Sequence, residues 1–171
     1  SDHLWDRLNR AFLMTEHPHD LTKGLALLAD LFKVEGMALY ITCPISVSCL
    51  WCAGLYPFDT AQLGSLVRLY AYAVDWTSFS VKTPEEAIAR AFCTRQLAEF
   101  EEERPLVPAT WLAASPLLRA GQPQGCLVLQ SSAPAVLTAE STGLLRELSS
   151  YLAEMVGRYR PQLDRLGREY A

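Results

Sequence analysis

The sequence predicts an α+β domain, with a sheet of five or six strands and helices before, within and after it. Three observations support this class. Residues 110–159 contain two apolar runs joined by the turn GQPQG and followed by a long helical pattern. Two β-favouring runs, MALYIT over 37–42 and VSCLWCA over 47–53, lie close together earlier in the chain. Apolar residues at helical spacing occupy the first 33 residues.

Length and composition indicate one domain over residues 1–171, because 171 residues with half of them apolar form a single core. Residues 160–171 are expected to be a helical linker toward an output domain, and the start at Ser1 without Met fits a fragment of a longer polypeptide. The net charge of −4 and the scattered basic residues argue against nucleic-acid binding. No apolar run reaches the roughly 18 to 20 residues of a membrane span. Five cysteines without a regular framework favour reduced thiols in the cytoplasm.

The first half predicts two helices and then two strands. Leu4, Trp5, Leu8 and Phe12 share one helical face. Asp20 then caps a second helix that runs to about residue 33, before Gly36 ends the pattern. The strands over 37–42 and 47–53 follow, with the tight connection CPIS between them.

The middle of the chain is mixed. Residues 59–67 predict a helical turn or two, whereas the alternation in RLYAYAVDW over 68–76 predicts a strand. Thr83, followed by Pro84 and two glutamates, is a strong start for a helix that runs to about Arg95. Residues 97–100 then predict a short strand, and EEERPLVP over 101–108 a polar loop.

The last helix carries a heptad-like apolar seam, which predicts a homodimer formed through the terminal helices. The seam residues are Leu145, Leu148, Leu152, Met155 and Tyr159.

Three segments resemble the conserved pattern of GAF domains, and the resemblance covers nearly all of the chain. They are the run SPLL from Ser115, the run GCLVL from Gly125, and TAE from Thr138 leading into Leu144 and Leu145. The resemblance implies a central antiparallel sheet with the N- and C-terminal helices on one face. A shorter helix and loops on the other face would enclose a small-molecule cavity. It also implies a regulatory sensor module of a bacterial signalling protein, joined covalently to an output domain.

The candidate ligand-binding residues are aromatic side chains with a few polar ones, the composition that such a cavity needs. They are Tyr40, Trp51, Tyr70, Tyr72, Trp76, Arg95, Trp111 and Ser115. The identity of the small molecule stays open. In the alternative hypothesis these rings fill the space, and the domain is a ligand-free dimerisation or docking scaffold.

The sequence predicts no catalytic residue, no cofactor and no metal. It lacks the motifs GxSxG, HExxH and GxGxxG. GAF domains that reduce free methionine sulfoxide carry cysteines in a loop that here reads EEERPLVPATW. A third hypothesis is a redox or metal sensor built on Cys43, Cys49 and Cys52. Residues three apart on a regular strand point to opposite faces, which argues against a joint role for the last two.

Overall fold

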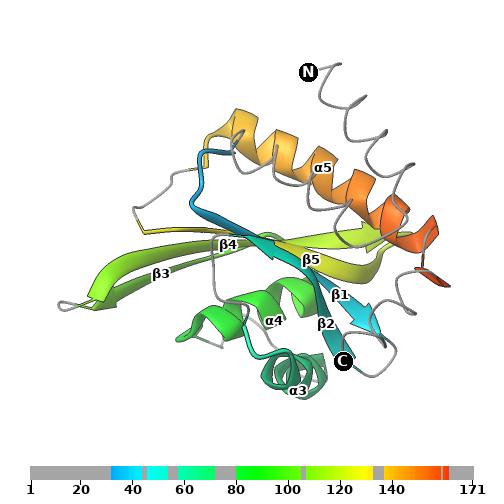
Figure 1. The fold of residues 1–171 in the computed structure, drawn as a ribbon, viewed down its shortest axis with the longest axis horizontal. Helices are drawn as coiled ribbons and strands as arrows, with labels where there is room; N and C mark the ends of the chain where they lie inside the picture. The colour runs from blue at the N-terminus through cyan, green and yellow to red at the C-terminus, as the bar shows by residue number, and fades with distance from the viewer. Residues whose placement is uncertain are drawn as a thin grey trace.

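The centre of the molecule is a five-stranded sheet in the order β2-β1-β5-β4-β3, with antiparallel pairing throughout (Figure 1). The computed structural model describes residues 32–43, 46–53, 58–71, 80–104, 107–132, 137–158 and 160–161. The strands are β1 Gly36–Cys43, β2 Ser46–Ala53, β3 Ala98–Arg104, β4 Val107–Arg119 and β5 Gln122–Ser131. The predicted α+β class and the two early strands are therefore confirmed.

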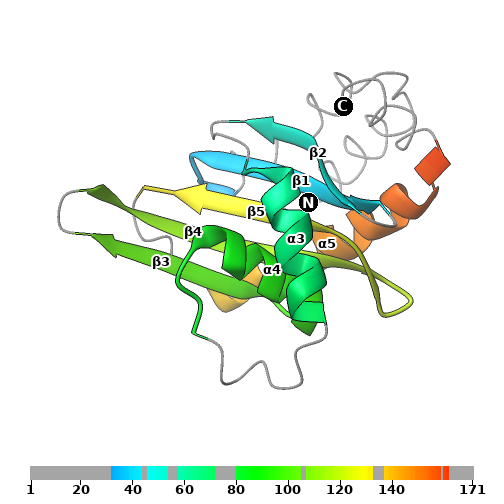
Figure 2. The ribbon, with the colours of Figure 1, turned by 90° about the horizontal axis from the view of Figure 1, so that it is seen from below.

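Helices cover both faces of the sheet. Helix α5, Ala139–Arg158, lies on one face, while α3, Thr60–Ala71, and α4, Pro84–Thr94, lie on the other (Figures 1 and 2). The predicted terminal-helix layer is thus confirmed for α5. The predicted helices within residues 1–31 and the predicted linker beyond residue 161 lie outside the described residues. None of the helices in the described ranges is both long and apolar enough to cross a membrane.

Local sequence signals explain why α4 and α5 begin where they do. The Thr83 hydroxyl accepts a hydrogen bond from the Glu86 N–H at 3.2 Å, with Pro84 at the first helical position. Helix α4 ends at Arg95, which adopts the left-handed conformation at φ 58°. Thr138 begins α5 in the same way, since its hydroxyl accepts from the Ser141 N–H at 3.1 Å. The predicted start and end of α4 are confirmed.

Two predicted elements in the middle are wrong. Residues 68–71 belong to helix α3 and not to a strand. Leu63 and Val67, four apart, both contact the core beneath α3, and this helical spacing outweighs the short alternation that follows. Residues 101–104 and 107–108 are strand and not loop, because β3 and β4 pair there, with Arg104 opposite Val107. Cross-strand pairing stabilises a segment whose composition is polar.

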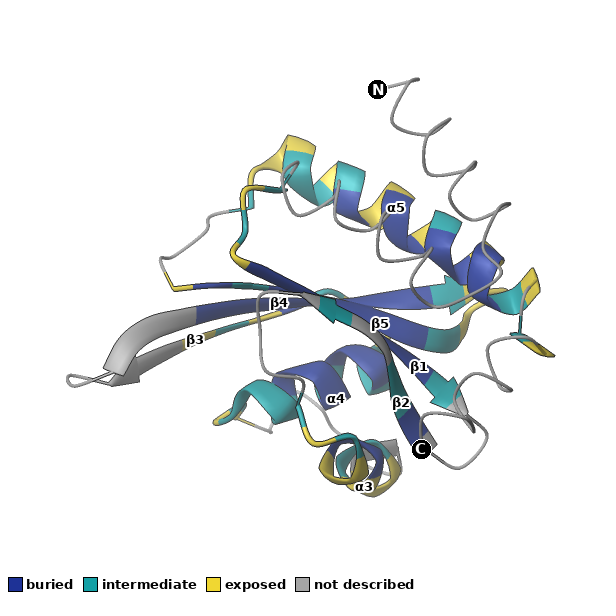
Figure 3. Cartoon of the chain, in the orientation of Figure 1, coloured by how far each residue is buried: buried dark blue, intermediate teal, exposed yellow. Residues whose placement is uncertain are grey.

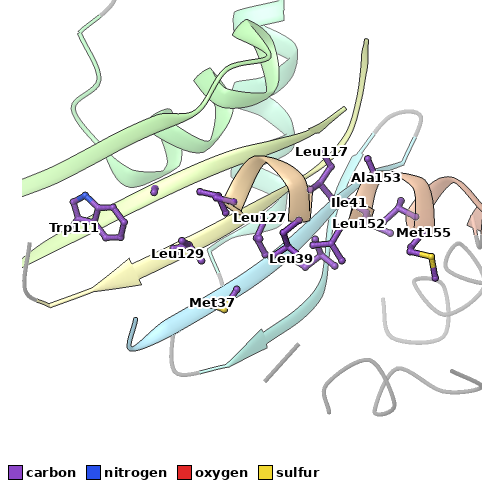
Figure 4. Close-up of a cluster of buried hydrophobic side chains, with 14 residues drawn as sticks. Met37, Leu39, Ile41, Trp111, Leu117, Leu127, Leu129, Leu152, Ala153 and Met155 are labelled. Carbon is purple, nitrogen blue, oxygen red and sulfur yellow. The ribbon is translucent and has the colours of Figure 1, made fainter. Parts of the chain in front are cut away.

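Two apolar clusters, one on each face of the sheet, form the core (Figure 3). The α5-face cluster consists of Met37, Leu39, Ile41, Trp111, Ala113, Leu117, Leu127, Leu129, Leu145, Leu148, Leu152, Ala153, Met155 and Val156 (Figure 4). The α4-face cluster consists of Ala38, Tyr40, Val47, Leu63, Ala87, Ile88, Ala91, Phe92, Ala98, Leu112, Ala114, Cys126 and Val128. Alternate residues of each central strand enter opposite clusters, as the period of a strand requires.

The predicted dimer seam is wrong for the four of its residues that the structure describes. Leu145, Leu148, Leu152 and Met155 are no more than 5% exposed, and they pack against the sheet of their own chain. The sheet therefore covers the apolar stripe of α5, so these side chains are not available to a partner. Tyr159, the last residue of the predicted seam, lies outside the described residues.

Candidate functional site

A cavity of about 720 Å³ lies at the edge of the sheet, beside helix α5. It forms where β4 continues beyond its neighbour, because the first β3–β4 pair is Ala98 with Ala114 and β4 runs on to Arg119. Three segments contribute three lining residues each. They are Arg95, Gln96 and Leu97 from the α4–β3 connection, Ser115, Pro116 and Leu118 from β4, and Arg146, Ser149 and Ser150 from α5.

Two buried hydroxyl groups in the lining join the sheet to α5. Ser115 and Ser149 are 3% and 4% exposed, and their oxygens lie 2.7 Å apart. The Ser149 hydroxyl also donates to the Leu145 carbonyl at 2.7 Å. Since a serine has one hydroxyl hydrogen, Ser115 must be the donor to Ser149. The Ser115 oxygen therefore keeps acceptor capacity within the cavity lining.

Among the lining residues that the structure describes, the two charged side chains are both positive. Arg95 and Arg146 are exposed, and neither forms an ion pair within the described part of the chain. Arg119, at the end of β4, differs because its Nε lies 3.6 Å from a carboxylate oxygen of Glu154. Arg95 also follows the last turn of α4, whose carbonyl groups favour a positive charge. The cavity thus combines two cationic side chains with a buried hydroxyl acceptor.

Two of the predicted ligand-binding residues, Arg95 and Ser115, line this same cavity. Trp111 lies elsewhere on the α5 face, where its indole N–H donates to Glu99 at 3.3 Å. The expectation that Trp111 and Ser115 face the α4 side is therefore wrong. Both lie an even number of residues from Ala113 and Leu117 on β4, so their side chains point to the same face, toward α5.

Tyr40 lies on the opposite face of the sheet. It is fully buried in the α4-face cluster, and its hydroxyl oxygen accepts from the Phe58 N–H at 2.9 Å. Burial raises the pKa of this phenol above its ordinary value. Tyr40 therefore serves as a packed core residue with a satisfied hydroxyl group.

The other predicted aromatic residues are not placed at a site. Trp51 lies in β2 and Tyr70 in α3, but the structure does not describe their side chains. Tyr72 and Trp76 lie outside the described residues. Their predicted role in ligand binding stays a prediction.

Sequence reasoning missed the contribution of α5 to the cavity. Ser149 carried a usable signal, because it lies four residues after Leu145 on the buried stripe of the helix. A polar residue on an apolar stripe needs a partner within the fold. Arg146 and Ser150 carried no such signal, since exposed polar residues are ordinary on a helix.

The cysteines of β2 share one face, contrary to the expectation. Leu39 pairs with Trp51 and Tyr40 with Cys49, so Leu50 is an extra residue in β2. This β-bulge shifts the alternation by one residue. Cys49 and Cys52 consequently both pack against the α4-face cluster.

The thiols of Cys93 and Cys126 are weak nucleophiles at neutral pH. Burial raises the pKa of Cys93 to about 11 and raises the pKa of Cys126 as well. A thiol with a raised pKa stays protonated at neutral pH. Over the ranges that the structure describes, no group of three or more His, Cys, Asp or Glu residues could hold a metal ion.

The same arrangement of strands and helices occurs in solved structures. The GAF domain of a phosphoenolpyruvate-protein phosphotransferase from Acinetobacter superposes with a TM-score of 0.61 at 16% identity, over 94% of this chain and 97% of that one. The fold is that of a GAF domain. The fold that the sequence resemblance implied is thereby confirmed.

Two further solved structures with a similar fold belong to proteins of different function. The type II free methionine-R-sulfoxide reductase from Thermoplasma acidophilum has a TM-score of 0.57 at 10% identity, over 90% of this chain and 96% of that one. Residues 122 to 287 of a methyl-accepting chemotaxis protein have a TM-score of 0.58 at 10% identity, over 92% and 98%. No protein-family model and no curated protein matches the sequence.

Proposed function

We propose that this chain is a regulatory ligand-sensing domain of a bacterial signalling protein, and that its ligand binds in the cavity between β4 and α5. The observation that carries the proposal is that α5 supplies Arg146, Ser149 and Ser150 to the cavity lining. The structural similarity to the GAF domain of a phosphotransferase and to part of a chemotaxis protein supports a role in signalling.

The geometry suggests how binding could be transmitted. A molecule in the cavity contacts the sheet edge on one side and α5 on the other. Its affinity therefore depends on the position of α5 relative to β4. A ligand shifts a conformational equilibrium only by its difference in affinity between the two states. Helix α5 would then pass the change to residues 160–171 and to a covalently linked output domain.

A library screen followed by hydrogen exchange tests this function. Thermal-shift screening of the chain against small metabolites should yield compounds that raise the melting temperature. Those compounds should also slow amide exchange in α5 near Ser149. Ser150→Trp should abolish both effects by filling the cavity. Glu147→Trp, exposed on the same helix and absent from the lining, should keep them.

A ligand-free scaffold is the second candidate, and one observation favours it. Tyr40, Leu63, Ile88 and Phe92 are each at most 2% exposed and pack in one cluster between the sheet and helices α3 and α4. These four side chains thus occupy space in that layer that a ligand would otherwise take. A screen in which no compound raises the melting temperature would favour the scaffold.

We infer that the chain is not a catalyst, although one structural neighbour is a reductase. The raised pKa values of Cys93 and Cys126 support this, because thiol catalysis needs a thiolate. The shared face of Cys49 and Cys52 keeps a redox sensor as an alternative. Mass spectrometry after treatment with hydrogen peroxide tests it, since a sensor would form one defined disulfide and an inert pair would not.

A further inference from the structure

The charge of the cavity differs in sign from that of the chain. Acidic residues outnumber basic ones by 19 to 15 in the sequence, yet the lining residues that the structure describes include two arginines and no acidic residue. Neither arginine is neutralised by an ion pair in the described ranges. A cavity that concentrates uncompensated positive charge in this way attracts anions.

Arginine is suited to particular anions. Its planar guanidinium group presents a fork of N–H donors that matches the oxygens of a carboxylate or a phosphate. An anion in the cavity would also lower the repulsion between two like charges. We propose that the cavity binds a small organic anion, whose carboxylate or phosphate group pairs with Arg146 and Arg95.

The buried hydroxyl group of Ser115 in the cavity lining adds a second requirement for the ligand. The Ser115 hydroxyl donates to Ser149 and keeps its oxygen as an acceptor. A ligand hydroxyl or ammonium group satisfies that acceptor, whereas an alkyl group leaves it unpaired. The preferred anion therefore also carries a hydrogen-bond donor, as a hydroxy acid or an amino acid does.

Such a ligand would bridge elements from both sides of the sheet. Arg95 follows α4, which covers one face, and Arg146 belongs to α5, which covers the other. One anion would thus hold the α4–β3 connection and α5 together. This inference rests on the proposed function, because it names the class of ligand for that cavity.

The experiment is an NMR titration of the isotope-labelled chain. The probes are lactate, propionate, inorganic phosphate and the neutral lactamide. Lactate should produce saturable shifts at the amides of Gln96, Leu97, Ser149 and Ser150. Propionate should bind more weakly and lactamide should not bind. Saturation by phosphate with no response to lactate would identify a phosphate-bearing ligand and still support the anion site.

Single-residue variants distinguish binding by the arginines of the cavity from a general effect of the net charge of the chain. Arg146→Gln should weaken lactate binding by about tenfold, the effect of one lost charge-assisted hydrogen bond. Arg95→Asn should act in the same direction, and asparagine tolerates the left-handed backbone there. The matched control is Arg158→Gln, which removes one exposed charge from the same helix outside the cavity and should leave binding unchanged.

Several results would overturn the inference. Equal weakening by Arg158→Gln would show that only the net charge matters. Binding of lactamide as tightly as lactate would exclude an anion site. If the library screen found only neutral compounds in the cavity, the inference would fail while the proposed sensing function stood. If neither the screen nor the titration detected binding, both would fail.

Discussion

The hydroxyl oxygens of Ser115 and Ser149 lie 2.7 Å apart and join strand β4 to helix α5 across 34 positions of sequence. Around them the interface is formed by apolar residues such as Leu117, Leu148 and Leu152. A polar contact in this position fixes how far α5 can slide along the sheet without breaking a buried hydrogen bond. The same pair forms part of the cavity lining, so the register of α5 and the shape of the cavity are linked.

Removing one of these two hydroxyl groups should lower the free energy of unfolding, because the other hydroxyl group then stays buried without its partner. Ser149→Ala should lower the free energy of unfolding by about 1 to 2 kcal/mol, because Ser115 is left buried without its acceptor. The double variant with Ser115→Ala should cost less than the sum of the two single changes. Urea denaturation of all four proteins measures this coupling. Strict additivity would show that the two hydroxyl groups act independently.

Leu148 should behave as a core residue and not as a dimer contact. Leu148→Ala should lower the free energy of unfolding by about 2 to 5 kcal/mol, since it opens a cavity between α5 and the sheet. The neighbouring exposed variant Glu147→Ala should change stability by less than about 0.5 kcal/mol. Denaturation together with light scattering checks both points. A Leu148→Ala protein that kept its stability but lost self-association would restore the dimer hypothesis.

Gly125 should not tolerate a side chain. A Cβ atom there would lie 2.2 Å from the backbone oxygen of Tyr40, on the adjacent strand β1. Gly125→Ala should therefore lower the free energy of unfolding by about 2 to 3 kcal/mol. Gly143→Ala is the matched control, because a Cβ atom on this exposed residue of α5 would have no other part of the fold within 4 Å. That change should raise stability by about 0.5 to 1 kcal/mol, since alanine favours a helix.

Stability should fall at alkaline pH. Burial raises the pKa of Cys126 and of Tyr40, so the folded chain keeps protons that the unfolded chain loses above about pH 8.5 for a thiol and about pH 10 for a phenol. A raised folded-state pKa means that this stability is complete below the unfolded-state pKa and declines as the pH rises above it. Melting temperatures between about pH 7 and pH 10.5 measure the decline.

Cys126→Ala separates this effect from other alkaline changes. The variant should be less stable than the wild type at pH 7, because it leaves a void in the α4-face cluster. Its stability should nevertheless decline less steeply above about pH 8.5, since one titrating group is gone. Parallel declines in the two proteins would contradict the linkage.

Much of the fold was predictable because its signals are local. The cap at Thr83, the turn before Gly125 and the apolar stripe of α5 each depend on residues a few positions apart. The errors arose where distant pairing outweighed local composition. The acidic segment 101–104 is strand because β4 lies beside it, and the bulge at Leu50 exists only through pairing with β1.

The chain alone specified the α+β class, the strand pair at 37–53 and the capped helices, since hydrophobic periodicity and capping act over short distances. Which surface each apolar stripe packs against depends on contacts between residues far apart in the sequence. The stripe on α5 matches a dimer seam equally well until the sheet is seen to cover it. In the same way, Arg95, Ser115 and Arg146 line one cavity only because β4 extends beyond the end of β3 and α5 lies beside that part of β4. This arrangement depends on contacts between distant segments, so no local sequence pattern predicts it.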